Sequence, residues 1–218
     1  MRFRDRFDAG RRLAAELTAY AGRPDVLVLA IPRGGVVVGY EVARLLRVPL
    51  DVFIVRKIGA EHIPELAVGA LASGGVQLID ESIVRAVHMS HEALDRIIAG
   101  ERAELERRES AYRGVHAPSL IEGKVVLLVD DGVATGASMR VAIAALRRHV
   151  PTQIVVAVPV VDVSVVPILA AEADHFVAVS TPSHLGAVGE WYGNFDQTTD
   201  EEVIELLRRA DRASRAAD

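Results

Sequence analysis

The stretch Val125-Val126-Leu127-Leu128-Val129-Asp130-Asp131-Gly132-Val133-Ala134-Thr135-Gly136-Ala137-Ser138 says most about how this chain folds. An uninterrupted apolar run ends in two adjacent carboxylates, and a loop of small and hydroxyl residues leads into a helix-like segment. Carboxylates at a strand end can accept hydrogen bonds from sugar hydroxyls or hold Mg2+. The N–H groups and hydroxyls at a helix N-terminus suit a phosphate. Together they predict one ligand that carries both a ribose and a phosphate.

Simpler explanations cover only part of this stretch. A strand that ends in an Asp-Gly turn explains one carboxylate and the glycine. It does not explain the second carboxylate together with Thr135, Gly136 and Ser138. A Walker A loop is excluded because no Gly-Lys-Ser/Thr follows, and a dinucleotide fingerprint is excluded because no predicted strand is followed by Gly-x-Gly-x-x-Gly.

Length and composition are those of one α/β domain, which we expect to span residues 1–218 with a modest addition. The net charge of -5 argues against nucleic acid or an anionic membrane as a partner. The chain has no Cys, which excludes disulfides and Cys nucleophiles and suits a reducing cytosol. Its N-terminus is too charged for a signal peptide, and no apolar stretch approaches the ~20 residues of a membrane span. We therefore expect a cytoplasmic protein.

Apolar runs without alternation are separated by helical patterns, which predicts a twisted, mainly parallel sheet with helices on both faces. The strands are expected at 26–30, 50–55, 125–129, 154–158 and 176–179, and the helices at 8–20, 35–46, 137–148 and 162–171. Ligands on such sheets bind at the carboxyl ends of the strands. The loops after Ala30, Val55 and Val129 should therefore form the site.

Two regions depart from this rhythm. Residues 57–64 are predicted to be a loop, and 66–71 with 76–79 a hairpin. Two charged helices follow within an insertion of about 80–116, and a plain surface role is the more expected one for the longer helix, 90–113. The tail, about 180–218, begins irregularly and ends in a charged helix over 200–213.

The segment from Val129 to Met139 resembles the signature of type I phosphoribosyltransferases, which bind 5-phosphoribosyl 1-diphosphate (PRPP) there. The resemblance is greatest to bacterial members without an assigned substrate. It implies that Asp130 and Asp131 hold the ribose hydroxyls, either directly or with a metal ion between them. It implies that the loop behind them surrounds the 5-phosphate. The PRPP-binding residues of this loop would be Gly132, Val133, Ala134, Thr135, Gly136, Ala137 and Ser138.

A second loop, Pro32-Arg33-Gly34-Gly35, follows the first strand. Glycines let a backbone approach an anion closely, and Arg33 has the right charge. A strand–helix turn with a surface Arg explains the same residues equally well. In the family, the equivalent loop contacts pyrophosphate, often through a cis peptide. The bond from Arg33 to Gly34 is the candidate for it.

A third loop, Arg56-Lys57-Ile58-Gly59, is similar to that of the adenine-type members, although two solvated cations at a strand end would look the same. In the family a mobile lid begins here, and its basic residues reach pyrophosphate. The lid would run from about Lys57 to Glu65 and exclude water. Within it, Glu65 is a possible base, but a solvated carboxylate is the more expected interpretation, and His62 is the one histidine of interest.

The tail holds the candidates for contact with an acceptor. Family members cover the base with a hood that often includes a stacked aromatic ring, and Trp191, Tyr192 and Phe195 are available here. A core beneath the irregular tail is the slightly favoured alternative for these rings. Ala134 stands where hypoxanthine/guanine-type members have an acidic residue, which speaks against that substrate class.

The resemblance implies transfer of 5-phosphoribosyl from PRPP to a nitrogenous base, or the reverse, with Mg2+ as cofactor and pyrophosphate as product. The catalytic residues would be Arg33, Lys57, Asp130 and Asp131, with Arg56 as a further PRPP ligand. A homodimer is usual in the family. One alternative is a PRPP-sensing regulator with little turnover. A phosphosugar hydrolase is a third hypothesis, but its nucleophile or metal cluster is not evident.

Overall fold

The computed structural model describes residues 2–114 and 117–215. Its main sheet has the strand order β2-β1-β6-β7-β8, and all neighbours are parallel. These strands are β1 (Val26–Ala30), β2 (Leu50–Val52), β6 (Val125–Val129), β7 (Gln153–Val160) and β8 (His175–Ser180). The predicted parallel α/β sheet is thus confirmed.

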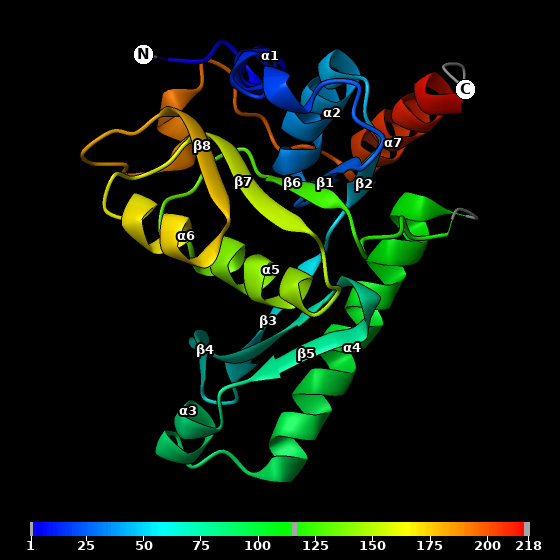
Figure 1. Cartoon of the computed structure of the whole chain (residues 1–218). Helices are drawn as coiled ribbons and strands as arrows, with labels where there is room; N and C mark the ends of the chain where they lie inside the picture. The colour runs from blue at the N-terminus through cyan, green and yellow to red at the C-terminus, as the bar shows by residue number, and fades with distance from the viewer. Residues whose placement is uncertain (1, 115–116, 216–218) are drawn as a thin grey trace.

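Helices cover both faces of this sheet, as Figure 1 shows. Alternate residues of each strand face opposite ways, so that Val26 and Val28 pack with α1 and α2 while Leu27 and Leu29 pack with α5. This double burial is why the strands are continuously apolar. The covering helices are α1 (Arg6–Glu16), α2 (Gly34–Leu46), α5 (Ala137–Arg147) and α6 (Val166–Glu172), and short 3-10 turns occupy η1 (Thr18–Tyr20) and η3 (Val188–Trp191).

A second, antiparallel sheet projects from this body. It consists of β3 (Val55–Ala60), β4 (Ile63–Ala72) and β5 (Val76–Ile79), and the last two are joined by the 3-10 turn η2 (Ser73–Gly75). The predicted hairpin is confirmed, but the predicted loop over 57–64 is wrong. Ile58 and Ala60 are buried against the helices behind the sheet, and this burial favours a strand where the local composition suggested a loop.

The insertion folds as the two predicted helices, α3 (Glu81–Ala86) and α4 (His91–Arg113). Asp80 and Ser90 cap them through their side-chain oxygens. The longer helix is not a plain surface helix. Its buried residues pack against the second sheet and against α7 (Asp200–Arg215), because its sparse apolar stripe finds partners on both. Residues 115–116 and 216–218, which belong to the predicted insertion and tail, lie outside the described residues.

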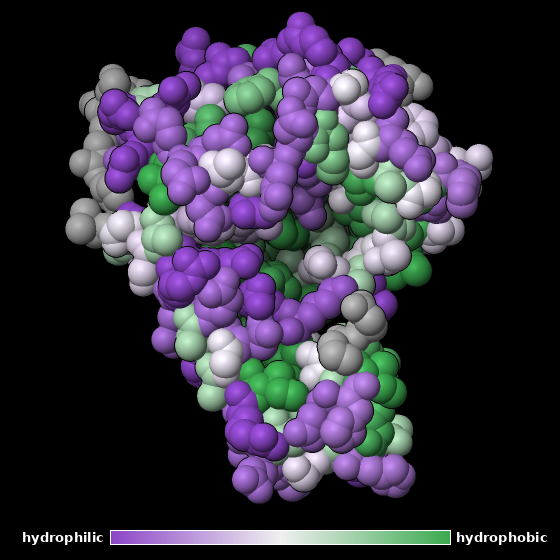
Figure 2. Space-filling model, turned by 180° about the vertical axis from the view of Figure 1, so that it is seen from behind, coloured by the Kyte–Doolittle hydropathy of each residue, from purple (hydrophilic) through white to green (hydrophobic). Residues whose placement is uncertain are grey.

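We call β3, β4, β5, α3 and α4 the arm. In Figure 1 the arm extends away from the main sheet, while the far end of α4 comes back to α7. Figure 2 shows the molecule from behind, with a broad body, a narrower arm and apolar surface in the hollow between them. Among the described residues, no helix is both long and apolar enough to cross a membrane.

Candidate active site

Two adjacent carboxylates follow β6 at the carboxyl edge of the main sheet. Val129, the last residue of β6, is in register with Ala30, the last residue of β1, so the loops after both strands emerge together. The start of α2 lies directly on the acids. A Cβ atom at Gly34 would overlap the Asp131 carboxylate, and one at Gly35 would lie 3.0 Å from Oδ1 of Asp130. The two glycines are therefore required by a close approach that a larger residue would block.

Arg6 completes this cluster from the N-terminal helix. Its Nε donates to Oδ2 of Asp131 at 2.7 Å, and the two side chains are only 11% and 16% exposed. Its guanidinium carbon lies 3.8 Å from the centre of the Phe195 ring. Sequence reasoning missed Arg6, since it is one of several arginines near the N-terminus and lies 125 residues from its partner.

The two acids of the pair have raised pKa values, and the positive charge of Arg6 opposes this. Burial raises the pKa of Asp130 well above its usual value, and the charge of Asp131 raises it further. Burial also raises the pKa of Asp131, although its hydrogen bond to Arg6 opposes this. Asp131 donates its backbone N–H to Oδ1 of Asp130 at 2.8 Å. One guanidinium thus faces two carboxyl groups, and a bound cation or hydroxyl donors would favour the ionised form of both.

The loop that follows the acids is fixed by backbone hydrogen bonds at Val133, and it carries exposed side chains after that residue. Val133 donates to the Val160 carbonyl at 2.9 Å and accepts from Asp162 at 3.0 Å, and its side chain is buried. Gly136 has φ of 76° directly before α5, a backbone conformation that favours glycine. Thr135 and Ser138 are exposed at this helix start. The loop therefore presents N–H groups and hydroxyls to the solvent beside the acids.

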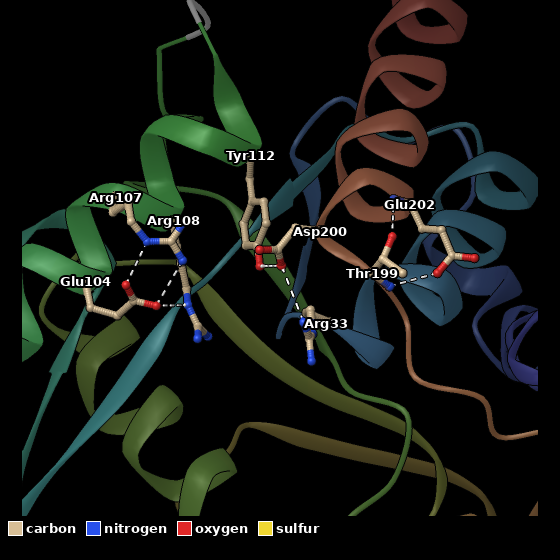
Figure 3. A network of polar contacts seen from close by, with 8 residues as sticks. All are labelled: Arg33, Glu104, Arg107, Arg108, Tyr112, Thr199, Asp200 and Glu202. Carbon is tan, nitrogen blue, oxygen red and sulfur yellow. Dashed lines mark hydrogen bonds and ion pairs between the residues drawn. The ribbon is translucent and has the colours of Figure 1, made fainter.

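Arg33 lies in the loop that precedes α2. The cis peptide of this loop joins Pro32 to Arg33, so the expected bond between Arg33 and Gly34 was the wrong one. The Arg33 Nη1 atom is 3.7 Å from Oδ1 of Asp200 at the start of α7. The same oxygen accepts a 2.7 Å hydrogen bond from the hydroxyl of Tyr112 on α4 (Figure 3).

The structure separates Arg56 from Lys57. Both belong to β3, where consecutive side chains point to opposite faces. Arg56 pairs with Glu101 of α4, with Nη2 and Oε2 2.6 Å apart, whereas Lys57 is exposed. The predicted lid is instead a pair of strands with a tight turn, at which His62 is exposed. The side chain of Glu65 lies outside the described residues.

The aromatic residues of the tail pack next to the acid pair. Tyr192 is 1% exposed, its ring centre is 5.4 Å from that of Phe3 and 4.9 Å from that of Phe195, and its hydroxyl donates to the Asp131 carbonyl. The alternative that these rings form a small core is confirmed for Tyr192. Trp191 and Phe195 are half-buried around it, and their contact with a base stays a prediction.

A family model for the phosphoribosyl transferase domain matches residues 3–166, which include the acid pair and both glycine-containing loops. The chain belongs to this family. It is 42% identical over 210 residues to a Mycobacterium tuberculosis protein named as a candidate phosphoribosyl transferase, covering 96% of this chain and 47% of that protein. The chain therefore spans about half the length of this curated relative.

A solved structure is similar over nearly the whole chain. The crystal structure of TT1426 from Thermus thermophilus has a TM-score of 0.84 and 44% sequence identity. The alignment covers 96% of this chain and 99% of that one. The arrangement of sheet and helices is therefore similar to that of this solved protein.

Proposed function

We propose that this chain transfers the 5-phosphoribosyl group of PRPP to a nitrogenous base, or catalyses the reverse reaction. The observation that carries the proposal is the meeting of two loops at one sheet edge. The acid pair and the open phosphate-type loop behind it follow β6, the Gly34–Gly35 turn follows β1, and these two segments lie side by side. Their chemistry matches the ribose, the 5-phosphate and the diphosphate of PRPP in that order.

The acid pair holds the ribose in this proposal. Its carboxylates accept hydrogen bonds from the two ring hydroxyls, and Arg6 fixes the orientation of Asp131. As the bond from the anomeric carbon to the diphosphate oxygen breaks, positive charge develops on the sugar ring. Once the ribose hydroxyls donate to them, the Asp130 and Asp131 carboxylates would favour that state. The nitrogen of the base then forms the new bond, and pyrophosphate leaves with the electron pair.

The 5-phosphate and the diphosphate would lie at opposite ends of the acid pair. Residues 134–138 would hold the 5-phosphate at the start of α5, where Thr135 and Ser138 are exposed. Arg33 and the N–H groups of the Gly34–Gly35 turn would hold the diphosphate. Lys57, exposed on β3, would approach the diphosphate only through a movement of the arm, which would also exclude water. Most of the catalysis would then be positioning and electrostatics.

The residues present fit Mg2+ as a cofactor that arrives with its substrate. No three His, Asp or Glu side chains come together as a metal site in residues 2–114 and 117–215. Mg2+ commonly uses one or two carboxylates together with substrate phosphates and water, and Asp130 and Asp131 supply such carboxylates. When bound, the ion would neutralise charge on the diphosphate. The chain's own part is to hold the sugar hydroxyls beside it.

The acceptor would be a small nitrogenous base held near the tail. Ala134 supplies no acid next to the phosphate loop, so the chain would not assist a 6-oxopurine through that position. Trp191 and Phe195 are the half-buried rings of the tail that would contact the base, although Phe195 already packs against Arg6 and Tyr192. A homodimer and a cytoplasmic location remain predictions from the resemblance and from the composition.

The test is a screen for pyrophosphate release with PRPP, Mg2+ and a panel of nucleobases. We expect release that depends on one class of base and is abolished in Asp130→Asn/Asp131→Asn. PRPP binding without turnover on any base would favour the alternative of a PRPP-sensing regulator. Absence of both binding and turnover would contradict the proposed function.

A further inference from the structure

One carboxylate oxygen joins three separate elements beside the proposed diphosphate site. Oδ1 of Asp200 lies 3.7 Å from Nη1 of Arg33 and accepts the 2.7 Å hydrogen bond from the Tyr112 hydroxyl. Figure 3 shows Asp200 between these two partners. Arg33 belongs to the loop before α2, Tyr112 to α4 of the arm and Asp200 to the first turn of α7. The Asp200 carboxylate thus faces Arg33, the cation to which the proposed function assigns the diphosphate.

Tyr112 is held in place by burial and donates a hydrogen bond to Asp200. Tyr112 is 3% exposed and packs in the cluster that includes Val203 and Leu206 of α7. Burial, and then the hydrogen bond to Asp200, raise the pKa of Tyr112 to about 12. The hydroxyl therefore keeps its proton at neutral pH and remains a donor to the carboxylate.

The start of α7 is also fixed. Thr199 donates its N–H to Oε2 of Glu202 at 2.8 Å, and Glu202 donates its N–H to Oγ1 of Thr199 at 3.2 Å. This reciprocal pair is a capping box, which satisfies the free N–H groups of a helix start. Asp200 lies between Thr199 and Glu202 in the sequence, so its backbone position is set by this box and is independent of Arg33.

The contact between Asp200 and Arg33 is weaker than the one between Asp200 and Tyr112. A separation of 3.7 Å is too long for a hydrogen bond, and the two side chains are 35% and 36% exposed. Ion pairs of this kind are weak and are readily replaced by a stronger anion. The two α4 arginines in Figure 3, Arg107 and Arg108, each donate through Nε to Glu104 at 2.7 Å. Glu104 thus engages both of these α4 cations in closer contacts than the one between Asp200 and Arg33.

We propose that Asp200 is a positioning residue that competes with the diphosphate for Arg33. The inference rests on the proposed function. Asp200 holds the Arg33 guanidinium at the start of α7. A bound diphosphate displaces the carboxylate but still feels its charge, because Tyr112 and the capping box keep Asp200 close. The chain thereby limits the affinity for pyrophosphate and favours its release after the reaction.

The test uses Asp200→Asn, which removes the charge and keeps an oxygen for the Tyr112 hydroxyl. Calorimetric titration with pyrophosphate and Mg2+ should show binding about two- to fivefold tighter than in the wild type, as expected for the loss of one exposed competing charge. In an Arg33→Ala background the same substitution should change the affinity less than about twofold, because the contested cation is gone. A residue with a merely structural role would give no such gain.

Glu201→Gln is the matched control. It removes the same charge one residue further along α7, where the side chain is exposed. Tighter binding in Asp200→Asn alone, lost in the Arg33→Ala background, supports the proposal. Equal gains in both charge variants, or unchanged or weaker binding in Asp200→Asn, overturn it while leaving the proposed function intact. A wild-type protein that binds neither pyrophosphate nor PRPP contradicts the proposed function and this inference together.

Discussion

Arg6 and Asp131 form a 2.7 Å ion pair that links the first helix to the end of β6. The pair is largely buried and is extended by the Phe195 ring, which lies against the Arg6 guanidinium. The N-terminal segment is therefore part of the candidate site rather than an appendage to it. Asp131 owes its orientation to a residue from a distant part of the sequence.

Arg6→Ala should destabilise the protein by about 3 kcal/mol, because removal of one partner leaves a buried charge without compensation. Chemical denaturation would measure the change. Arg4→Ala is the control, since that side chain is 73% exposed and should change stability by less than about 0.5 kcal/mol. Combining Arg6→Ala with Asp131→Asn should recover part of the loss. A double variant as unstable as the sum of the two single variants would argue against a direct pair.

Asp130→Asn should stabilise the fold while it abolishes PRPP binding. The burial and the neighbouring charge that raise the pKa of Asp130 make its ionised form costly. In the wild type, this group contributes stability that is present at low pH and is lost as pH rises through its raised pKa. The difference in melting temperature between variant and wild type should therefore grow as pH rises from about 4 toward 7. A difference that is independent of pH would show that Asp130 carries no raised pKa.

Gly34→Ala should destabilise the protein and remove PRPP binding, since the added Cβ overlaps the Asp131 carboxylate. Gly100→Ala is the control on α4, where nothing lies within 4 Å of the added atom. That control should stabilise by up to about 1 kcal/mol through helix propensity. Thermal melting and PRPP titration of both variants would test the close approach. Normal PRPP affinity in Gly34→Ala would mean that the turn does not lie on the acids.

Lys57→Ala should lower turnover more than it lowers PRPP affinity, because its side chain lies on the arm and would act only on closure. Arg56→Ala should have a smaller effect on turnover. Its guanidinium is engaged by Glu101, and the pair is about a quarter exposed, so its loss costs at most about 1 kcal/mol of stability. Steady-state kinetics with a productive base would compare the two. Equal losses of turnover and affinity in Lys57→Ala would assign it to ground-state binding only.

The acid pair and its loop could be predicted because all their residues are contiguous and each has a distinctive side chain. The parallel sheet could be predicted equally well. Strands that are buried on both faces, such as Val125–Val129, show no alternation of polar and apolar residues. Lys57 was harder. Its strand alternates for only a few residues, and the burial of Ile58 becomes evident only when α4 is in place.

Arg6 and Asp200 could not have been singled out from the sequence. Each is a common surface-type residue near one end of the chain, and its role depends on a partner more than a hundred residues away in the sequence. Neither periodicity nor local spacing records such contacts. The same holds for the contact of Gly34 with Asp131, where two loops that are recognisable separately become one site only through the pairing of β1 with β6.

The most direct measurement is a crystal structure of the protein with PRPP and Mg2+. Our account predicts the ribose hydroxyls within hydrogen-bond distance of Asp130 and Asp131, with the 5-phosphate at residues 134–138 and the diphosphate beside Arg33. An empty cleft at this edge of the sheet, or PRPP bound elsewhere with the two acids facing away from it, would contradict the account.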